Sequence, residues 1–468
     1  MELYPLTKPQ RSIFDMQQYY GGAIANITGA AFFDEPVELS ALRRAFGKAF
    51  ELHNSLRIRI KIKDGTPMQY ITPHKSEEFD ELCFDVEHDF ETWLTTLART
   101  PLDMGGALCK IVLLEVAGRT GYVIHLHHLI ADAWTYGILT DTIAKYLKNE
   151  LPERTYSYLD YIETEKEYAK SPRREKDKAY FLSCFEKCSE PTYLCERPAK
   201  NNAAEQLKIA IDKKTSAKIT AFCENNSISP YSLFMNTLAV YIYRIKGVND
   251  IYIGTAILNR SGKKEKSTAG MYINTVPVLM QVSDTLNISE NIQSNSVSIM
   301  GILRHQRYQY NEFLSDIREK YGFKGRLYDV VLSYQNAVLP DGVTARWVFP
   351  GCQSEALNIH MNDRQHEGVY HIDYRRCADN RCNRLARRTC SGRISIPTQF
   401  GMASDRVLTG RRYGKGCYQD CWSLRQSSGC ISRLPRQAHT VWNVHKGIKI
   451  SRYKNEAHLN EAFPRGAC

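Results

Sequence analysis

The chain of 468 residues contains no uninterrupted apolar run of eighteen or more residues, so it lacks a segment long enough for a membrane-spanning helix. Residues 1–5 carry neither the basic nor the apolar stretch of a secretory signal peptide. These two absences predict a cytoplasmic protein that does not enter membranes.

Motifs for tightly held metals or nucleotides are also missing. No HExxH or CxxC pattern supplies zinc ligands, and no glycine-rich phosphate loop follows a strand and opens a helix. A metal site built on His125 and His127 would therefore lack further ligands. The sequence predicts neither a resident metal nor a stored cofactor.

The net charge of +11 and half of the 14 cysteines are concentrated in residues 375–468. This segment has 15 Arg and 4 Lys against 5 acidic residues, with little apolar periodicity. Its arginines are dispersed rather than gathered on a helix face, a zinc module would pair cysteines more closely than Cys417 and Cys421, and a disulfide module does not suit a reducing cytosol. We interpret the segment as an out-of-frame tail that follows a reading-frame shift near codon 374, and we predict no nucleic-acid partner.

Local apolar patterns predict an α/β fold with two layers. Apolar residues recur at intervals of three and four from about Leu39 to Leu52, which indicates an amphipathic helix. Strict alternation over Arg57–Lys63 predicts a half-buried strand whose basic face is solvated. A second helix is expected to begin at Ser229 and Pro230, followed by a strand over Ile251–Ile257.

The second half of the chain thus repeats the character of the first. We expect an N-terminal lobe over residues 1–174 and a C-terminal lobe over residues 175–374. Residues 171–206, between them, have the charged composition of a linker.

A compact group of polar residues follows the apolar run that begins at Gly121. It comprises His127, His128, Asp132 and Trp134. An imidazole exchanges a proton near neutral pH, and a carboxylate four residues later can orient a neighbouring group. Adjacent histidines in a strand face opposite ways, so the two have different roles. Taken by itself, each histidine could instead be an ordinary core or surface residue whose hydrogen bonds are satisfied and which has no catalytic role.

The segment His127–Thr135 resembles the HHxxxDGWS signature of condensation domains from nonribosomal peptide synthetases, which are relatives of chloramphenicol acetyltransferase. Ala133 stands where the family has glycine. Six more family elements follow the same order; they are Tyr4–Gln10 (LTxAQ), Leu52–Arg57 (RHExLR), Tyr158–Tyr161 (YxDYA), Gly270–Thr275 (GxFVNT), His305–Gln306 (HQD) and Asp329–Asn336. Leu52, Asn54 and Leu279 depart from the pattern.

The resemblance implies two chloramphenicol-acetyltransferase-like lobes arranged as a V around a central tunnel. It implies His128 as the catalytic residue, with His127 and Asp132 shaping the loop and Trp134 packing behind it. In the family an arginine from this half of the chain or from the next pairs with the signature aspartate, and Arg57 is expected to pair with Asp132 in this structural role. The residues expected to line the tunnel are Asn274, Thr275, Ser333 and Asn336.

The activity that the resemblance implies is amide-bond formation. An amine on a downstream carrier protein attacks an acyl or peptidyl thioester on an upstream carrier, and the phosphopantetheine arms arrive with these two partners. An adenylation domain is an expected neighbour. Whether His128 acts as a base or orients the amine stays open at this point.

Two other interpretations remain. The HHxxxD signature also occurs in O- and N-acyltransferases that use acyl-CoA, and in epimerisation domains. The departures at Ala133, Leu52 and Leu279, together with the tail, are also typical of a degenerate scaffold that binds carriers without turnover.

We predict that sequencing the coding DNA from about codon 360 to beyond codon 468 will reveal a second frame that restores a closing strand and helix. Such a frame would continue into an adenylation or carrier domain. An intact frame that encodes the arginine- and cysteine-rich tail would contradict this hypothesis.

Overall fold

The computed structural model describes residues 2–75, 78–150, 156–194, 202–335, 339–362 and 370–377, and the backbone of Ile450–Ser451. The hypothesis about the tail concerns residues that lie almost wholly outside the described ones. Within the described part, no helix is both long and apolar enough to cross a bilayer.

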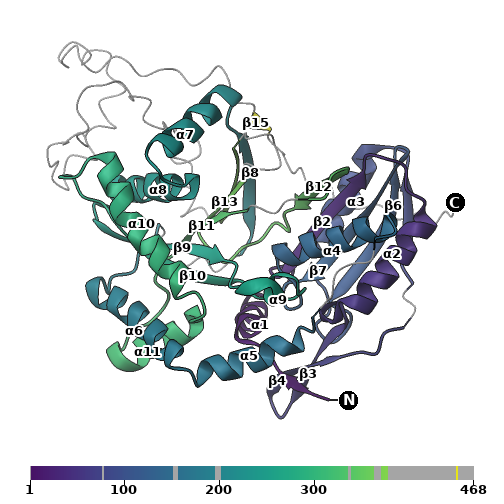
Figure 1. Cartoon of the computed structure of the whole chain (residues 1–468), viewed down its shortest axis with the longest axis horizontal. Coiled ribbons are helices and arrows are strands. Elements are labelled where there is room, and N and C mark those ends of the chain that lie inside the picture. The colour runs from purple at the N-terminus through teal and green to yellow at the C-terminus, as the bar shows by residue number, and fades with distance from the viewer. Residues whose placement is uncertain are drawn as a thin grey trace.

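The N-terminal half forms one lobe around a five-stranded sheet (Figure 1). Its strands run in the order β12 (Val343–Val348), β2 (Asn26–Phe33), β7 (Arg119–His127), β6 (Cys109–Val116) and β5 (Asp80–Phe84). A separate small sheet has the order β1 (Tyr4–Pro5), β4 (Thr66–Ile71) and β3 (Ile58–Lys63). The helices of this half are α1 (Lys8–Tyr20), α2 (Leu39–Leu52), α3 (Glu87–Arg99) and α4 (Ala133–Leu147), with the 3-10 turn η1 (Asn54–Arg57).

The second lobe is built on a larger sheet. Its strands run in the order β10 (Asn274–Gln281), β9 (Asp250–Ile257), β11 (Val330–Tyr334), β13 (Leu357–Asn362), β14 (His371–Cys377), β8 (Ala204–Ala210) and β15 (Ile450–Ser451). The helices that follow α4 are α5 (Leu159–Ala169), α6 (Pro172–Lys187), α7 (Lys213–Asn225), α8 (Pro230–Lys246), α9 (Gly262–Lys266), α10 (Ile288–Arg304) and α11 (Tyr310–Tyr321).

Helix α5 and strand β12 each connect the lobes. Helix α5 runs along the base of the molecule between them, and β12 leaves the second half of the chain to pair with β2 of the first lobe (Figure 1). A strand from residues 343–348 therefore completes the first lobe's sheet. The predicted linker region contains α6, and β14 extends three residues beyond Tyr374.

The predicted helix and strand of the first lobe form at the expected places. Helix α2 spans Leu39–Leu52 and buries one apolar stripe that includes Leu42 and Phe46. Strand β3 begins at Ile58, which is fully buried, whereas Ile62 near its end is 54% exposed. The half-buried strand is therefore confirmed, with its apolar face covered only at the start.

The predicted elements of the second lobe are also confirmed. The Ser229 side chain accepts a hydrogen bond from the Ser232 N–H, which caps α8, and Pro230 occupies the first turn. Strand β9 spans Asp250–Ile257 and is buried along most of its length.

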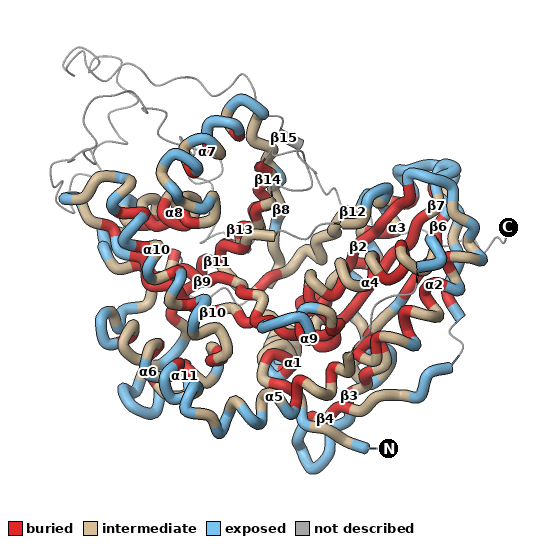
Figure 2. The backbone as a smooth tube through the Cα atoms, in the orientation of Figure 1, coloured by how far each residue is buried: buried red, intermediate tan, exposed pale blue. Residues whose placement is uncertain are grey.

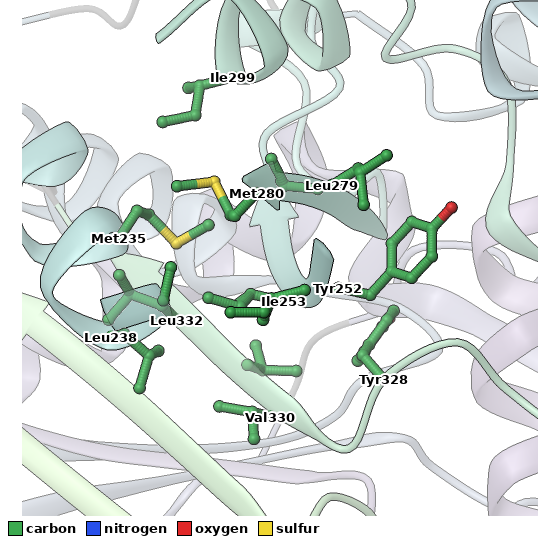
Figure 3. Packing of buried hydrophobic residues seen from close by; sticks show 14 of the residues in the cluster. Met235, Leu238, Tyr252, Ile253, Leu279, Met280, Ile299, Tyr328, Val330 and Leu332 are labelled. Carbon is green, nitrogen blue, oxygen red and sulfur yellow. The ribbon is translucent and has the colours of Figure 1, made fainter. Parts of the chain in front are cut away.

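Each lobe has its own apolar core (Figure 2). In the first lobe, α2 and α4 pack on one face of the sheet and α3 on the other. In the second lobe, residues of α8 and α10 interdigitate with β9, β10 and β11; Figure 3 labels Met235, Leu238, Tyr252, Ile253, Leu279, Met280, Ile299, Tyr328, Val330 and Leu332. The two cores hold the facing sides of the lobes in place.

Candidate active site

The histidine loop lies at the end of the central strand of the first lobe. Strand β7 pairs with β2 on one side and β6 on the other, so its end is held firmly. The His127 N–H donates to the Leu108 carbonyl (2.9 Å) and the His128 N–H donates to the Ala25 carbonyl (2.7 Å). Helix α4 begins only five residues later, at Ala133.

His127 is locked into the loop through its own side chain. Its Nδ1 atom accepts a hydrogen bond from the Leu129 N–H (3.1 Å), and the residue is 1% exposed. Burial lowers the pKa of His127 to about 3, so the ring is neutral at neutral pH. The predicted role of His127 in shaping the loop agrees with this contact.

His128 presents a partly exposed ring beside the loop. Its Nδ1 atom is buried and finds no hydrogen-bond partner within the described part of the chain. Burial lowers the pKa of His128, and the negative charge of Asp132 opposes the shift without cancelling it. The ring is therefore neutral near pH 7 and able to accept a proton.

His125, which shares a strand face with His127, is engaged elsewhere. Its Nδ1 atom lies 2.8 Å from the Thr28 hydroxyl, and burial lowers its pKa to about 4. His125 and His127 thus have separate partners and do not converge on a common point.

Asp132 is fully buried and all its contacts are structural. Its Oδ1 atom caps α4 by accepting hydrogen bonds from the Thr135 N–H (2.9 Å) and the Thr135 hydroxyl (3.0 Å). Its Oδ2 atom accepts from the Tyr272 N–H (3.2 Å). Because the next residue, Ala133, is the first of the helix and has no positive φ, alanine replaces the family's glycine without backbone strain.

The cation paired with Asp132 is Arg260, from the second lobe. Its Nη2 atom donates to both carboxylate oxygens, at 3.0 and 2.9 Å, and both side chains are fully buried. The guanidinium carbon also lies 4.0 Å from the centre of the Tyr272 ring. The same side chain donates to backbone carbonyls of Glu265, Thr268 and Gly270.

The prediction that Arg57 pairs with Asp132 is therefore wrong. Arg57 belongs to the turn η1, which directs its side chain to the carbonyls of Phe50 (2.9 Å) and Thr72 (2.6 Å). It braces the junction of α2 and β3 instead. The only signal for Arg260 in the sequence was an arginine placed three residues after the predicted strand Ile251–Ile257.

A segment of the second lobe between β9 and β10 docks on the loop, and we call residues 262–272 the bridging segment. The Trp134 indole N–H donates to the Lys266 carbonyl (2.8 Å), so Trp134 joins the lobes rather than packing behind the loop as predicted. The Thr135 hydroxyl oxygen accepts a hydrogen bond from the Gly270 N–H (3.0 Å). At Gly270, φ is +153° and a Cβ atom would lie 2.1 Å from the Tyr158 ring, so only glycine fits.

The predicted tunnel residues have different surroundings. The Asn274 amide donates to the carbonyls of Gln306 (3.1 Å) and Tyr308 (3.0 Å), and the residue is 4% exposed. Asn274 is thus an internal brace, and its place in the tunnel wall stays a prediction. The Thr275 carbonyl accepts a hydrogen bond from the Tyr328 hydroxyl (3.2 Å).

Ser333 and Asn336 come from the end of β11. The Ser333 hydroxyl lies 2.5 Å from Nδ1 of His360, a histidine on β13 that the sequence analysis missed. Asn336 lies outside the described residues. No sequence motif singled out His360, because it lies in a strand where it simply alternates with apolar core residues.

Two lobes that meet at an HHxxxD loop define an acyltransferase of the chloramphenicol acetyltransferase type. The chain belongs to the condensation domain family, whose model matches residues 1–367. Enzymes of this family form amide bonds in nonribosomal peptide synthesis.

Two bacterial peptide synthetases are among its relatives. The chain is 28% identical to surfactin synthase subunit 1 of Bacillus subtilis (strain 168) over 395 residues, which cover 79% of its length. It is 24% identical to tyrocidine synthase 3 of Brevibacillus parabrevis over 344 residues, which cover 71% of its length. It spans only 11% and 5% of these two relatives, and it therefore corresponds to one domain of much longer proteins.

Solved condensation domains share the fold. The starter condensation domain of rhizomide synthetase, in complex with C8-CoA, has a TM-score of 0.70 and 21% identity over 80% of this chain and 89% of that one. The first condensation domain of the calcium-dependent antibiotic synthetase has a TM-score of 0.71 and 19% identity, covering 83% and 94%.

We predict that Arg260, and not Arg57, is energetically coupled to Asp132. Arg260→Met is expected to lower the free energy of unfolding by about 3–5 kcal/mol, because it leaves a buried carboxylate unpaired. A double-mutant cycle with Asp132→Asn, followed by urea denaturation, should give a coupling energy of about 2–3 kcal/mol. The matched cycle with Arg57→Met should give less than about 0.5 kcal/mol. A stronger coupling with Arg57 would refute the assignment.

Proposed function

We propose that this chain joins a carrier-bound acyl or peptidyl thioester to a carrier-bound aminoacyl group. The observation that carries the proposal is the neutral imidazole of His128, held beside a loop that both lobes brace. Membership of the condensation domain family supplies the reaction class. The carriers, their phosphopantetheine arms and an adjoining adenylation domain are proposed by analogy with the much longer synthetases that the chain resembles.

In the proposed reaction, the amine nitrogen of the acceptor attacks the thioester carbonyl carbon of the donor. A new C–N bond forms, the C–S bond breaks, and the thiol leaves on the donor's arm while the nitrogen gives up a proton. A neutral His128 can take this proton or hold the amine by a hydrogen bond, and both roles require the unprotonated ring. The thioester supplies the activation, so we propose no stored cofactor.

Asp132 and Arg260 would act only through position. The carboxylate oxygens of Asp132 accept hydrogen bonds from Thr135 at the start of α4, from Arg260 and from the Tyr272 N–H. These bonds leave no lone pair of Asp132 directed at a substrate. Their task in this proposal is to hold the loop so that His128 meets the thioester in a fixed orientation. The reaction is proposed to take place in the cytoplasm, where acyl carriers are loaded.

The direct test uses the full chain with two separately loaded carriers and detects the amide product by mass spectrometry. We expect His128→Ala to lower the rate by about 100-fold or more, as for loss of a general base. His88→Ala, which removes an exposed histidine from α3, is the matched control and should keep the wild-type rate. An unchanged rate in His128→Ala would refute the proposal.

The same assay distinguishes the two alternative functions. Use of a free acyl-CoA donor, with no turnover of carrier-bound donors, would indicate the O- or N-acyltransferase interpretation. Binding of loaded carriers without product would indicate a degenerate scaffold.

The pH dependence should follow from the lowered pKa of His128. Because burial lowers this pKa below its usual value of 6.5, the unprotonated ring still predominates at pH 6.5. The rate enhancement that the enzyme provides should therefore fall only at lower pH. The measurement is kcat/KM against pH, divided by the rate of uncatalysed aminolysis with the same acceptor, which reports titration of the amine itself. An acid limb at or above pH 6.5 after this correction would contradict the prediction.

A further inference from the structure

The second-lobe sheet has a polar face on the side away from its helices. Along β13, Leu357, Ile359 and Met361 join the apolar core with residues of α8. The intervening residues Asn358 and His360 therefore project to the opposite face. Figure 1 shows α7, α8 and α10 on one side of this sheet and the first lobe on the other.

Polar residues on this face line up across four neighbouring strands, from β11 through β13 and β14 to β8. The Cα register pairs them directly, which makes two adjacent rows. We call these the polar rows; they are Ser333, His360, Asp373 and Lys208 in one row, and Asn358, Arg375 and Gln206 in the other.

Three buried polar atoms in the polar rows have no hydrogen-bond partner among the residues that the structure describes. They are Nε2 of His360, Oδ1 of Asn358 and Oδ1 of Asp373. Asp373 lies directly opposite His360 in the register, and Asn358 is two residues from His360 on β13, so the three belong to one patch. A buried polar atom without a partner is costly, and a bound group that satisfies several of them at once recovers that cost.

The partners of the neighbouring atoms define what the patch can bind. Nδ1 of His360 lies 2.5 Å from the Ser333 hydroxyl and accepts from the Gln335 amide (3.3 Å), so the ring carries its proton on Nε2. Oδ2 of Asp373 accepts from the Gln206 amide (2.8 Å) and from Arg375 (3.0 Å). Arg375 offsets the charge of Asp373, and burial holds the pKa of His360 well below its usual value, so that ring is neutral. What remains is two acceptor oxygens and one imidazole N–H, which suits a ligand hydroxyl or amide that donates to the oxygens and accepts from the ring.

The sheet face that carries the polar rows also contributes a residue to a pocket between the lobes. Ala204 precedes Gln206 by two residues on β8 and so shares its face. Ala204 lines a pocket of about 420 Å³ whose other wall is formed by residues 20–23 of the first lobe. Ala23 of this wall is two residues before Ala25, and the Ala25 carbonyl accepts a hydrogen bond from the His128 N–H.

We propose that the polar rows form a specificity site that binds a hydroxyl or amide N–H carried by the substrate. His360 and Asn358 are its central residues. The inference rests on the proposed function for the identity of the substrate, since the group would be part of the acyl donor or of the aminoacyl acceptor. It goes beyond that function by naming the kind of chemical group for which this chain selects on its substrate.

The test measures kcat/KM for matched pairs of substrates. The donor arm compares a straight-chain acyl thioester with the same chain bearing a hydroxyl, and the acceptor arm compares leucyl with asparaginyl carriers. We expect the wild type to prefer the hydrogen-bond-donating member by about tenfold in one arm. The arm that shows the preference identifies the substrate that occupies the site.

His360→Leu and Asn358→Leu should each reduce the preference to about one, which is a ratio of two kcat/KM values measured on the same preparation. His88→Leu makes the same chemical change as His360→Leu at an exposed position of α3 and should leave the preference intact. Equal turnover of both members by the wild type, or a preference that survives both substitutions, would overturn the inference while leaving the proposed function in place.

If no substrate is condensed at all, the proposed function fails and binding decides the inference separately. Unreactive pantetheine amides with and without the hydrogen-bond-donating group are titrated into protein labelled with ¹⁵N-histidine. A change in the Nε2 signal of His360 with only the donating analogues supports the site. No change, with His360→Leu used to assign the signal, rejects it.

Discussion

The ion pair between Asp132 and Arg260 is the interaction on which the rest of this structure depends. Neither charge is exposed, and each would be strongly destabilising without the other. The pair connects residues 128 positions apart in the chain, one at the start of α4 and the other just after β9. Its geometry therefore couples the histidine loop of the first lobe to the backbone of the second.

This coupling explains why one carboxylate has so many contacts. Asp132 caps α4, accepts the Tyr272 N–H and pairs with Arg260, so a shift of the bridging segment would disturb the helix start as well. Trp134 and Thr135, the next polar residues of the helix, add hydrogen bonds to the same segment. The loop that presents His128 is thus formed by both lobes together, which suits the proposed reaction between two carrier-bound substrates.

Burial has a different consequence for each polar group along this surface. It keeps His127 and His128 neutral, with the first held by the Leu129 N–H and the second partly exposed. In the polar rows, burial leaves atoms of Asn358 and His360 without partners. The first arrangement supports the proposed reaction step, and the second provides hydrogen-bonding capacity that the described residues leave unused.

The sequence by itself determined the local elements and the loop that carries the chemistry. The helix over Leu39–Leu52 and the strand over Ile251–Ile257 follow from apolar periodicity, which depends only on neighbouring residues. The family motif marked His128 and Asp132 for the same reason, since all its residues lie within one turn and one helix start. Only the tertiary structure decided that Arg260 rather than Arg57 pairs with Asp132, that Asn274 is an internal brace, and that His360 faces Ser333. Those choices depend on how two lobes and distant strands pack together, and sequence spacing contains no information about distances across a sheet or between lobes.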